Sequence, residues 1–332
     1  AAHARELAAR HRLNPSSSSH RLLLRLDDNE NVLRACIQMF AEAARVEGER
    51  RIMPAGEWLL DNAYLVEEQI RTARAHLPRE YSRELPRLAD GPSAGLPRVY
   101  DIALQNISHG DGRLDADMLR RFVAAYQEAS PLSLGELWAI PIMLRLALVE
   151  NLRRTAARVT AAWRDHLAAA RWADRLLETA ARDRKNVVAA VAEMADADVP
   201  LTSAFVTEFA RRLQGRNAAP ALPLTWLEER LAERGLNIGE MIRRESRRQA
   251  EDQLSVSNSV SGLRQLSRID WRDFVEALAI VEQILRRDPA GVYPRMDFET
   301  RDNYRHRVER LARRARLSEE QTALAALDLA RQ

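Results

Sequence analysis

The sequence predicts an all-α protein, a multi-helix bundle with two helical subdomains. Glycine and proline contribute only 12 and 13 of 332 residues, too few for the closely spaced turns of a β-sandwich or barrel. Alanine, leucine, arginine and glutamate dominate, and these residues favour helices. Hydrophobic residues make up 46% and charged residues 30%, with a mean hydropathy of −0.39. Such values are typical of a globular chain with a sizeable core.

Charge and cysteine content exclude several classes of protein. Basic residues number 51 and acidic residues 48, a net charge of +3, so no global electrostatic footprint for nucleic acid is present. Lys185 is the single lysine, and arginine supplies the other cations. Cys36 is alone, which excludes an internal disulfide and a cysteine-based metal site. No apolar run is long enough to cross a membrane, and the missing initiator methionine suggests a piece of a longer chain.

In the first third of the chain, apolar periodicity predicts two helices, at 28–44 and 57–77. Pro15 and the serines at 16–19 form a break before the first of them. Residues 78–97 contain several prolines and glycines and predict a long irregular connection.

The middle of the chain is the most hydrophobic part. Helices are predicted at 98–108 and 116–129, followed by a helix that runs almost unbroken to Ala181. Ser133 and Glu136 have the spacing of a capping box at its start. Arg145 interrupts its apolar surface, so we expect another helix to supply a polar partner.

We place a boundary between subdomains at residues 214–225, which are rich in proline and alanine; the predicted subdomains are 1–213 and 226–332. The alternating segment Ser255–Ser261 predicts a loop or weak helix, because no second strand could pair with it. Helices are predicted over the ranges 226–234, 238–254, 271–285, 297–316 and 318–331.

A search for reactive groups yields no catalytic, cofactor-binding or metal-binding residue. Asp115 and Asp117, like Asp196 and Asp198, form an Asp-x-Asp pair, but both pairs are interpreted as caps of the helices that follow. The seven histidines are scattered without the helical spacing of a zinc site, and no glycine-rich phosphate loop is present. We therefore expect no cofactor in this segment.

A concentration of arginine lies near the end of the chain. Residues 301–316 contain seven arginines against Asp302 and Glu309, a local net charge of +5. This charge fits a solvated helix face, or a basic segment on the cytoplasmic side of a membrane span that follows. No aromatic residues interleave with it as a nucleic-acid site requires. The candidate contacts with a membrane or partner are Arg305, Arg310, Arg313 and Arg314.

Several long blocks carry a family resemblance. They are EWLLDNAYLVEEQIR, RELPRLADGPSAGLPRVYDIAL, PLSLGELWAIPIMLRLALVENLRR, WLEERL and DPAGVYPRMDFETRDNYRHRVERLARR. Spread from about Arg21 to Arg316, they closely resemble the N-terminal region of cyclic β-1,2-glucan synthases. That resemblance implies a large bacterial inner-membrane protein, in which later domains transfer glucose from UDP-glucose. No catalytic residue of that family can be placed on this segment.

Two functional hypotheses follow. The first is a non-catalytic scaffold or regulatory module on the cytoplasmic face of the inner membrane. Its partners would be the transferase and membrane spans of the same polypeptide and an anionic membrane surface, with no nucleic acid. The second is a helical carbohydrate-binding or glycan-guiding module, since sugars stack on aromatic faces. Its candidate glycan contacts are Tyr81, Tyr100, Tyr126 and Trp138.

Overall fold

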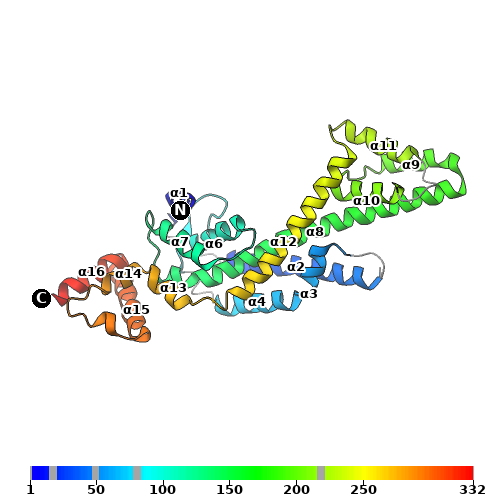
Figure 1. Ribbon diagram of the computed structural model, residues 1–332. Helices are drawn as coiled ribbons and strands as arrows, with labels where there is room; N and C mark the ends of the chain where they lie inside the picture. Colours follow the sequence, from blue (N-terminus) through cyan, green and yellow to red (C-terminus); the bar gives the residue numbers. More distant parts are fainter. Residues whose placement is uncertain (1, 15–20, 47–51, 78–83, 215–220, 332) are drawn as a thin grey trace. The chain divides into compact units, whose positions relative to one another are not determined.

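The computed structural model describes residues 2–14, 21–46, 52–77, 84–214 and 221–331. They are almost entirely helical, which confirms the predicted all-α fold (Figure 1). Two short strands, β1 (Leu13–Asn14) and β2 (Arg87–Leu88), pair antiparallel. Within the described ranges, no helix has the length and apolarity needed to cross a bilayer.

The helices follow one another along the chain, and β2 lies between α4 and α6. In the first half they are α1 (Ala2–Arg10), α2 (Arg21–Val46), α3 (Pro54–Asp61), α4 (Ala63–His76), α6 (Arg98–His109), α7 (Ala116–Gln127) and α8 (Leu134–Arg182). In the second half they are α9 (Val187–Asp196), α10 (Ser203–Gln214), α11 (Ala221–Ala232), α12 (Ile238–Gln265), α13 (Trp271–Leu278), α14 (Ile280–Leu285), α15 (Phe298–Ala315) and α16 (Glu319–Ala330). Two single 3₁₀ turns, Arg184–Asn186 and Tyr293–Arg295, precede α9 and α15.

The chain forms two compact units, each assembled from segments that are distant in sequence. Unit 1 comprises residues 1–29, 65–151 and 258–332, and unit 2 comprises residues 30–64 and 152–257. The predicted subdomains, 1–213 and 226–332, are contiguous and have other boundaries, so that division stays a prediction. Of the predicted boundary segment, residues 215–220 lie outside the described residues, while Gln214 ends α10 and residues 221–225 begin α11. The predicted break at 15–19 also lies outside them.

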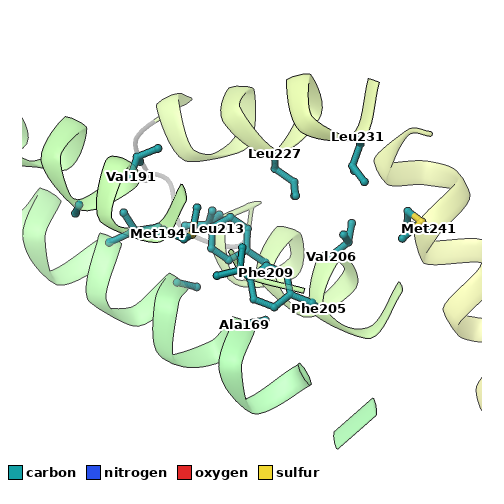
Figure 2. Close-up of a cluster of buried hydrophobic side chains, with 14 of the residues drawn as sticks. Ala169, Val191, Met194, Phe205, Val206, Phe209, Leu213, Leu227, Leu231 and Met241 are labelled. Atoms are coloured by element: carbon teal, nitrogen blue, oxygen red, sulfur yellow. The ribbon is translucent and has the colours of Figure 1, made fainter. Parts of the chain in front are cut away.

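Unit 2 contains an apolar core contributed by five helices. Figure 2 shows Phe205 and Phe209 of α10 in this cluster, with their rings stacked at a centroid distance of 5.6 Å. Side chains from the other helices close around them: Ala169 from α8, Met194 from α9, Leu227 and Leu231 from α11, and Met241 from α12. Because the apolar positions recur every three to four residues, each helix turns one face inward.

Most predicted helices are confirmed, including the continuous run through Pro141 to the end of α8. Its capping box forms, since the Ser133 backbone N–H donates to Glu136 and the Glu136 N–H donates to the Ser133 hydroxyl. The Arg145 guanidinium donates to Gln69 Oε1 of α4 at 2.8 Å, so its partner does come from another helix. Burial lowers the pKa of Arg145 below its ordinary value.

Two predicted helices are interrupted. The helix at 57–77 starts earlier and breaks at Asn62, whose side-chain amide donates to the Trp58 carbonyl and competes with the helical ladder. The helix at 271–285 breaks at Ala279, where the backbone is extended between α13 and α14. Its apolar stripe gives no sign of that break.

Of the two alternatives predicted for Ser255–Ser261, a loop or a weak helix, the structure shows a helix, because α12 continues through the segment. Val256 and Val260 are buried four residues apart, a helical spacing hidden within the alternation. The buried Ser255 hydroxyl lies 3.3 Å from Thr155 Oγ1, and the Asn151 amide donates to Ser259 Oγ at 3.0 Å. Partners on α8 therefore satisfy the small polar side chains of this helix.

Candidate functional site

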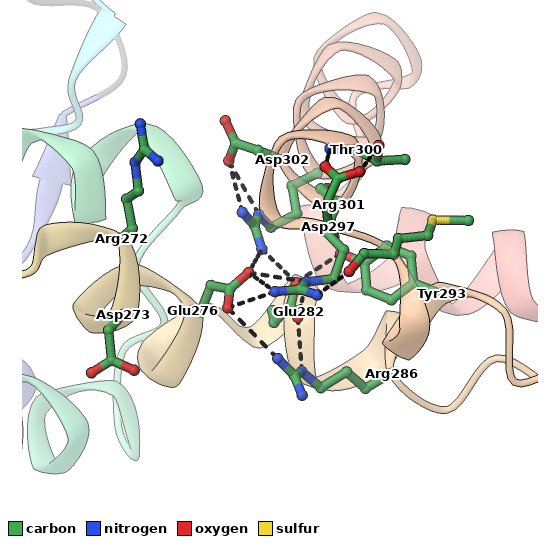
Figure 3. A network of polar contacts seen from close by, with 12 residues as sticks. Arg272, Asp273, Glu276, Glu282, Arg286, Tyr293, Asp297, Thr300, Arg301 and Asp302 are labelled. Atoms are coloured by element: carbon green, nitrogen blue, oxygen red, sulfur yellow. Dashed lines mark hydrogen bonds and ion pairs between the residues drawn. The ribbon is translucent and has the colours of Figure 1, made fainter.

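Unit 1 buries a network of charged side chains where α13, α14 and α15 meet (Figure 3). Arg305 of α15 is fully buried and donates to Glu282 at 2.6 Å, to Glu276 at 3.0 Å and to Asp302 at 2.9 Å. Arg301, one turn earlier, donates to both carboxylate oxygens of Glu276. Each guanidinium therefore meets at least one carboxylate inside the unit.

The electrostatics of this network keep Glu276 and Arg305 ionised. Burial alone would raise the pKa of Glu276, but hydrogen bonds from Arg301 and Arg305 bring it below its ordinary value. Burial alone would lower the pKa of Arg305, but its carboxylate partners raise it above the ordinary value. Burial and the hydrogen bond from its hydroxyl to Glu282 raise the pKa of Tyr293. None of these groups exchanges a proton near neutrality, which indicates a structural cluster.

A groove of about 860 Å³ lies in unit 1 around the first turn of α8. Its walls are mainly apolar, with contributions from the segment before β2 and from α14, α15 and α16. Three carboxylates gather at this end of α8: Glu136 from its own first turn, Glu309 from α15 and Glu319 from α16. The helix dipole favours negative charge at this position.

Glu319 is a carboxyl group of the groove whose pKa is raised toward neutrality. Its carboxylate accepts a hydrogen bond from the Leu134 backbone N–H at 2.9 Å, so α16 is attached to the start of α8. Burial raises the pKa of Glu319 to about 7, and the nearby carboxylates of Glu309 and Glu136 also raise it. Arg98 donates two hydrogen bonds of 2.6 and 2.7 Å to Glu136, and the His306 ring lies 3.0 Å from Glu309, so both carboxylates near Glu319 have basic partners.

The outward face of α15 carries arginines of a different kind. Arg307, Arg310 and Arg314 are exposed, and none has an ion-pair partner among the described residues. Their spacing of three and four residues places them on one side of the helix, opposite the buried Val308 and Ala312. Tyr304 and Leu311, seven residues apart, are 45% and 54% exposed beside them.

The predicted contact residues therefore divide. The prediction that Arg305 contacts a membrane or partner is wrong, because its side chain points inward to carboxylates and cannot reach an outside surface. Arg313 is exposed but paired, donating to Glu84 at 2.8 Å and to Glu309 at 2.6 Å. Arg310 and Arg314 are exposed without such partners among the residues described. Sequence reasoning passed over Arg307, although it lies one turn from Arg310 and two turns from Arg314 on the same side of the helix.

Two of the four predicted glycan contacts are corrected as well. Tyr100 and Tyr126 are 1% and 0% exposed, so neither ring offers a face to a sugar. Tyr81 lies outside the described residues. Trp138 is half-buried on the wall of the groove, with its ring at right angles to Phe298. Of the three described residues, only Trp138 has an exposed part of its ring, so they do not form one platform.

A polar chain that the sequence did not reveal connects α1, α6 and α7. The buried His11 ring lies 2.8 Å from the Tyr126 hydroxyl and 3.1 Å from an Asp101 carboxylate oxygen. The Ser93 hydroxyl donates to the other oxygen of Asp101. Hydrogen bonds from His11 and Ser93 outweigh the effect of burial and lower the pKa of Asp101. This series of hydrogen bonds fixes the N-terminal helix, and its side chains leave no open face for a substrate.

The Asp-x-Asp pairs have different outcomes. Asp115 caps α7, accepting hydrogen bonds from the backbone N–H groups of Asp117 and Met118, as predicted. Asp196 ends α9 and Asp198 follows it, several residues before α10 begins, so their assignment as helix caps is wrong. No group of three or more metal-ligating side chains occurs among the described residues.

Comparison with known proteins gives one relationship. No protein-family model matches the chain. Its sequence is 32% identical over 289 residues to the cyclic β-(1,2)-glucan synthase NdvB of Rhizobium meliloti (strain 1021). The match covers 87% of this chain and 10% of that protein, so the chain spans about a tenth of the length of its curated relative. The resemblance to cyclic β-1,2-glucan synthases is confirmed, and the chain is related to a protein of glycan synthesis.

Proposed function

We propose that this chain is a non-catalytic helical scaffold or regulatory module of a membrane-bound cyclic β-1,2-glucan synthase. The similarity to NdvB over 87% of the chain carries the proposal, because it extends across segments of both units.

The state of the charged groups supports a structural role. The buried charges described above are engaged in pairs: Arg98 with Glu136, and Arg305 with Glu276 and Glu282. The shifted pKa values of Arg98, Arg305 and Glu276 keep these three groups ionised near neutral pH, whereas a general acid or base needs a pKa near the working pH. Such pairs fix helices against one another.

Partners and location follow from the proposed membership. The module would contact the transferase and membrane spans of its own polypeptide, on the cytoplasmic face of a bacterial inner membrane, without nucleic acid and without a cofactor of its own. Arg310 and Arg314 remain its candidate contacts, and Arg313 is held by Glu84 and Glu309.

Two measurements test this function. The purified chain, incubated with radiolabelled UDP-glucose and linear β-1,2-glucan, should neither hydrolyse the nucleotide sugar nor extend the glucan. Turnover by the chain alone would overturn the proposal. In the full-length synthase, Phe209→Ala should unfold the core of unit 2 and reduce the output of cyclic glucan; unchanged output with an unfolded module would also contradict it.

The groove favours one second candidate, a glycan-guiding module. It is large enough for a short sugar chain, and Trp138 with nearby carboxylates could supply a ring face and hydrogen-bond acceptors. Titration of linear β-1,2-glucan against tryptophan fluorescence tests this function, with Trp138→Phe as the control. A change in the wild type that disappears in the variant would favour it, and no change at millimolar glucan would remove it.

A further inference from the structure

We infer that the outward face of α15, defined by Tyr304, Arg307, Arg310, Leu311 and Arg314, docks on an anionic lipid bilayer surface. The inference deepens the proposed function, on which it rests for the presence of a membrane nearby. The face itself is identified from exposure, charge and helical phase.

The cations of this face are free to bind phosphate. The arginines on the inner side of the same helix, Arg301 and Arg305, form ion pairs with Glu276 and its neighbours. Arg307, Arg310 and Arg314 have no carboxylate partner within the described part of the chain. A guanidinium donates two parallel hydrogen bonds to a phosphate, so three of them on one helix face form an array for lipid headgroups.

The apolar side chains beside them distinguish a bilayer from other anionic partners. Leu311 is 54% exposed and Tyr304 is 45% exposed, and both adjoin the arginine side of the helix. An interfacial helix combines basic residues with leucine and aromatic anchors that enter the boundary between headgroups and acyl chains. A free phosphate ligand would leave these anchors in water. The combination therefore favours a lipid surface.

A second arginine cluster in unit 2 provides a matched control. Arg243, Arg244 and Arg247 of α12 are three exposed arginines within five residues, and Glu240 and Glu251 line the same shallow surface. A triple reversal there changes the net charge of the chain by the same amount as one on α15. The two variants differ in the position of the cluster and in the carboxylates beside it.

The experiment is flotation of the 332-residue chain with phosphatidylcholine vesicles, with and without phosphatidylglycerol. The wild type should float with the anionic vesicles only, and added salt should weaken binding. R307E/R310E/R314E should lower the binding constant about 100-fold, at roughly fivefold per arginine. Leu311→Ser should lower it about fivefold without changing any charge. Circular dichroism verifies that each variant keeps its helices.

The control decides whether position matters. R243E/R244E/R247E should change binding by about twofold or less. Equal losses in both triple variants would show net-charge attraction alone and overturn the inference, as would absent binding by the wild type or full binding by R307E/R310E/R314E. If the α15 reversal weakened only association with the rest of the synthase, the partner would be protein and the inference would fail.

Failure of this inference is distinguishable from failure of the proposed function. Flotation needs no nucleotide sugar, and the turnover assay needs no vesicles. If the chain does not bind anionic vesicles and does not turn over UDP-glucose, only the proposed membrane site is refuted. If the chain floats with anionic vesicles and also turns over UDP-glucose, only the proposed scaffold role is refuted.

Discussion

The core around Phe209 in unit 2 and the network around Arg305 in unit 1 are both buried, yet they are stabilised differently. The first is apolar, and its stability depends on packed volume, which is nearly independent of pH and salt. The second depends on carboxylates and guanidinium groups that must match in number and geometry. The difference teaches that burial alone does not show how a residue stabilises this fold. The residues that it contacts determine whether its contribution comes from packing or from ion pairs.

The largest effect is expected in the apolar core. Phe209→Ala removes a fully buried ring that stacks on Phe205, and should reduce the free energy of unfolding by about 3–5 kcal/mol. Urea unfolding at several pH values should show a loss that stays constant with pH. A loss below about 1 kcal/mol would mean that the core is elsewhere.

The next effect concerns the ionic network. Glu276→Gln keeps the shape but removes the charge that Arg301 and Arg305 share, and should cost about 1.5–3 kcal/mol at neutral pH. Because the folded pKa of Glu276 lies below its ordinary value, its contribution is complete above the ordinary pKa and is lost as pH falls through the folded one. Wild type and variant should therefore converge in acid. A constant difference down to low pH would contradict this account.

A gain in stability is expected at Glu319. Its folded pKa of about 7 lies above the ordinary value of 4.5, so the wild type loses stability as pH rises between these values. Glu319→Gln keeps an oxygen to accept from Leu134 N–H and should stabilise the protein by about 1 kcal/mol at about pH 8, after allowance for screening. Thermal unfolding at acid and alkaline pH measures this. Destabilisation by the variant at pH 8 would refute the raised pKa.

The smallest effect sharpens the contrast within one helix. Asp273, one turn before Glu276 on α13, pairs with Arg120 at 2.6 Å, but both side chains are exposed. Asp273→Asn should change the free energy of unfolding by less than about 0.5 kcal/mol. Urea unfolding of this variant beside Glu276→Gln compares an exposed and a buried pair on one backbone. Similar losses would remove the distinction between them.

Helical periodicity predicted most of the fold. It located α15 to within one residue at each end, because Asp297 caps its start and apolar residues recur along it. It missed the break at Ala279, which no helix-breaking residue marks. It also missed the helical phase of Ser255–Ser261, since valines four residues apart fit both a strand and a helix, and only the partners on α8 decide between them.

The candidate site was predicted less well. The basic stretch was found, but Arg305 was grouped with Arg310 and Arg314 although it lies on the opposite side of the helix. A signal existed: Arg305 precedes the apolar Val308 by three residues and therefore shares its face. The acids that receive Arg305 lie on other helices, and no local pattern predicts that pairing.

The continuation of α12 through Ser255–Ser261 has a consequence for the handling of the protein. The segment carries no charge and alternates valine with small polar residues, the composition that intermolecular cross-β assembly selects. As long as the helix persists, its valines stay inside. When heat or denaturant unfolds α12, the same residues are exposed and can pair as strands with other copies of the chain. Refolding yields should therefore fall steeply with protein concentration.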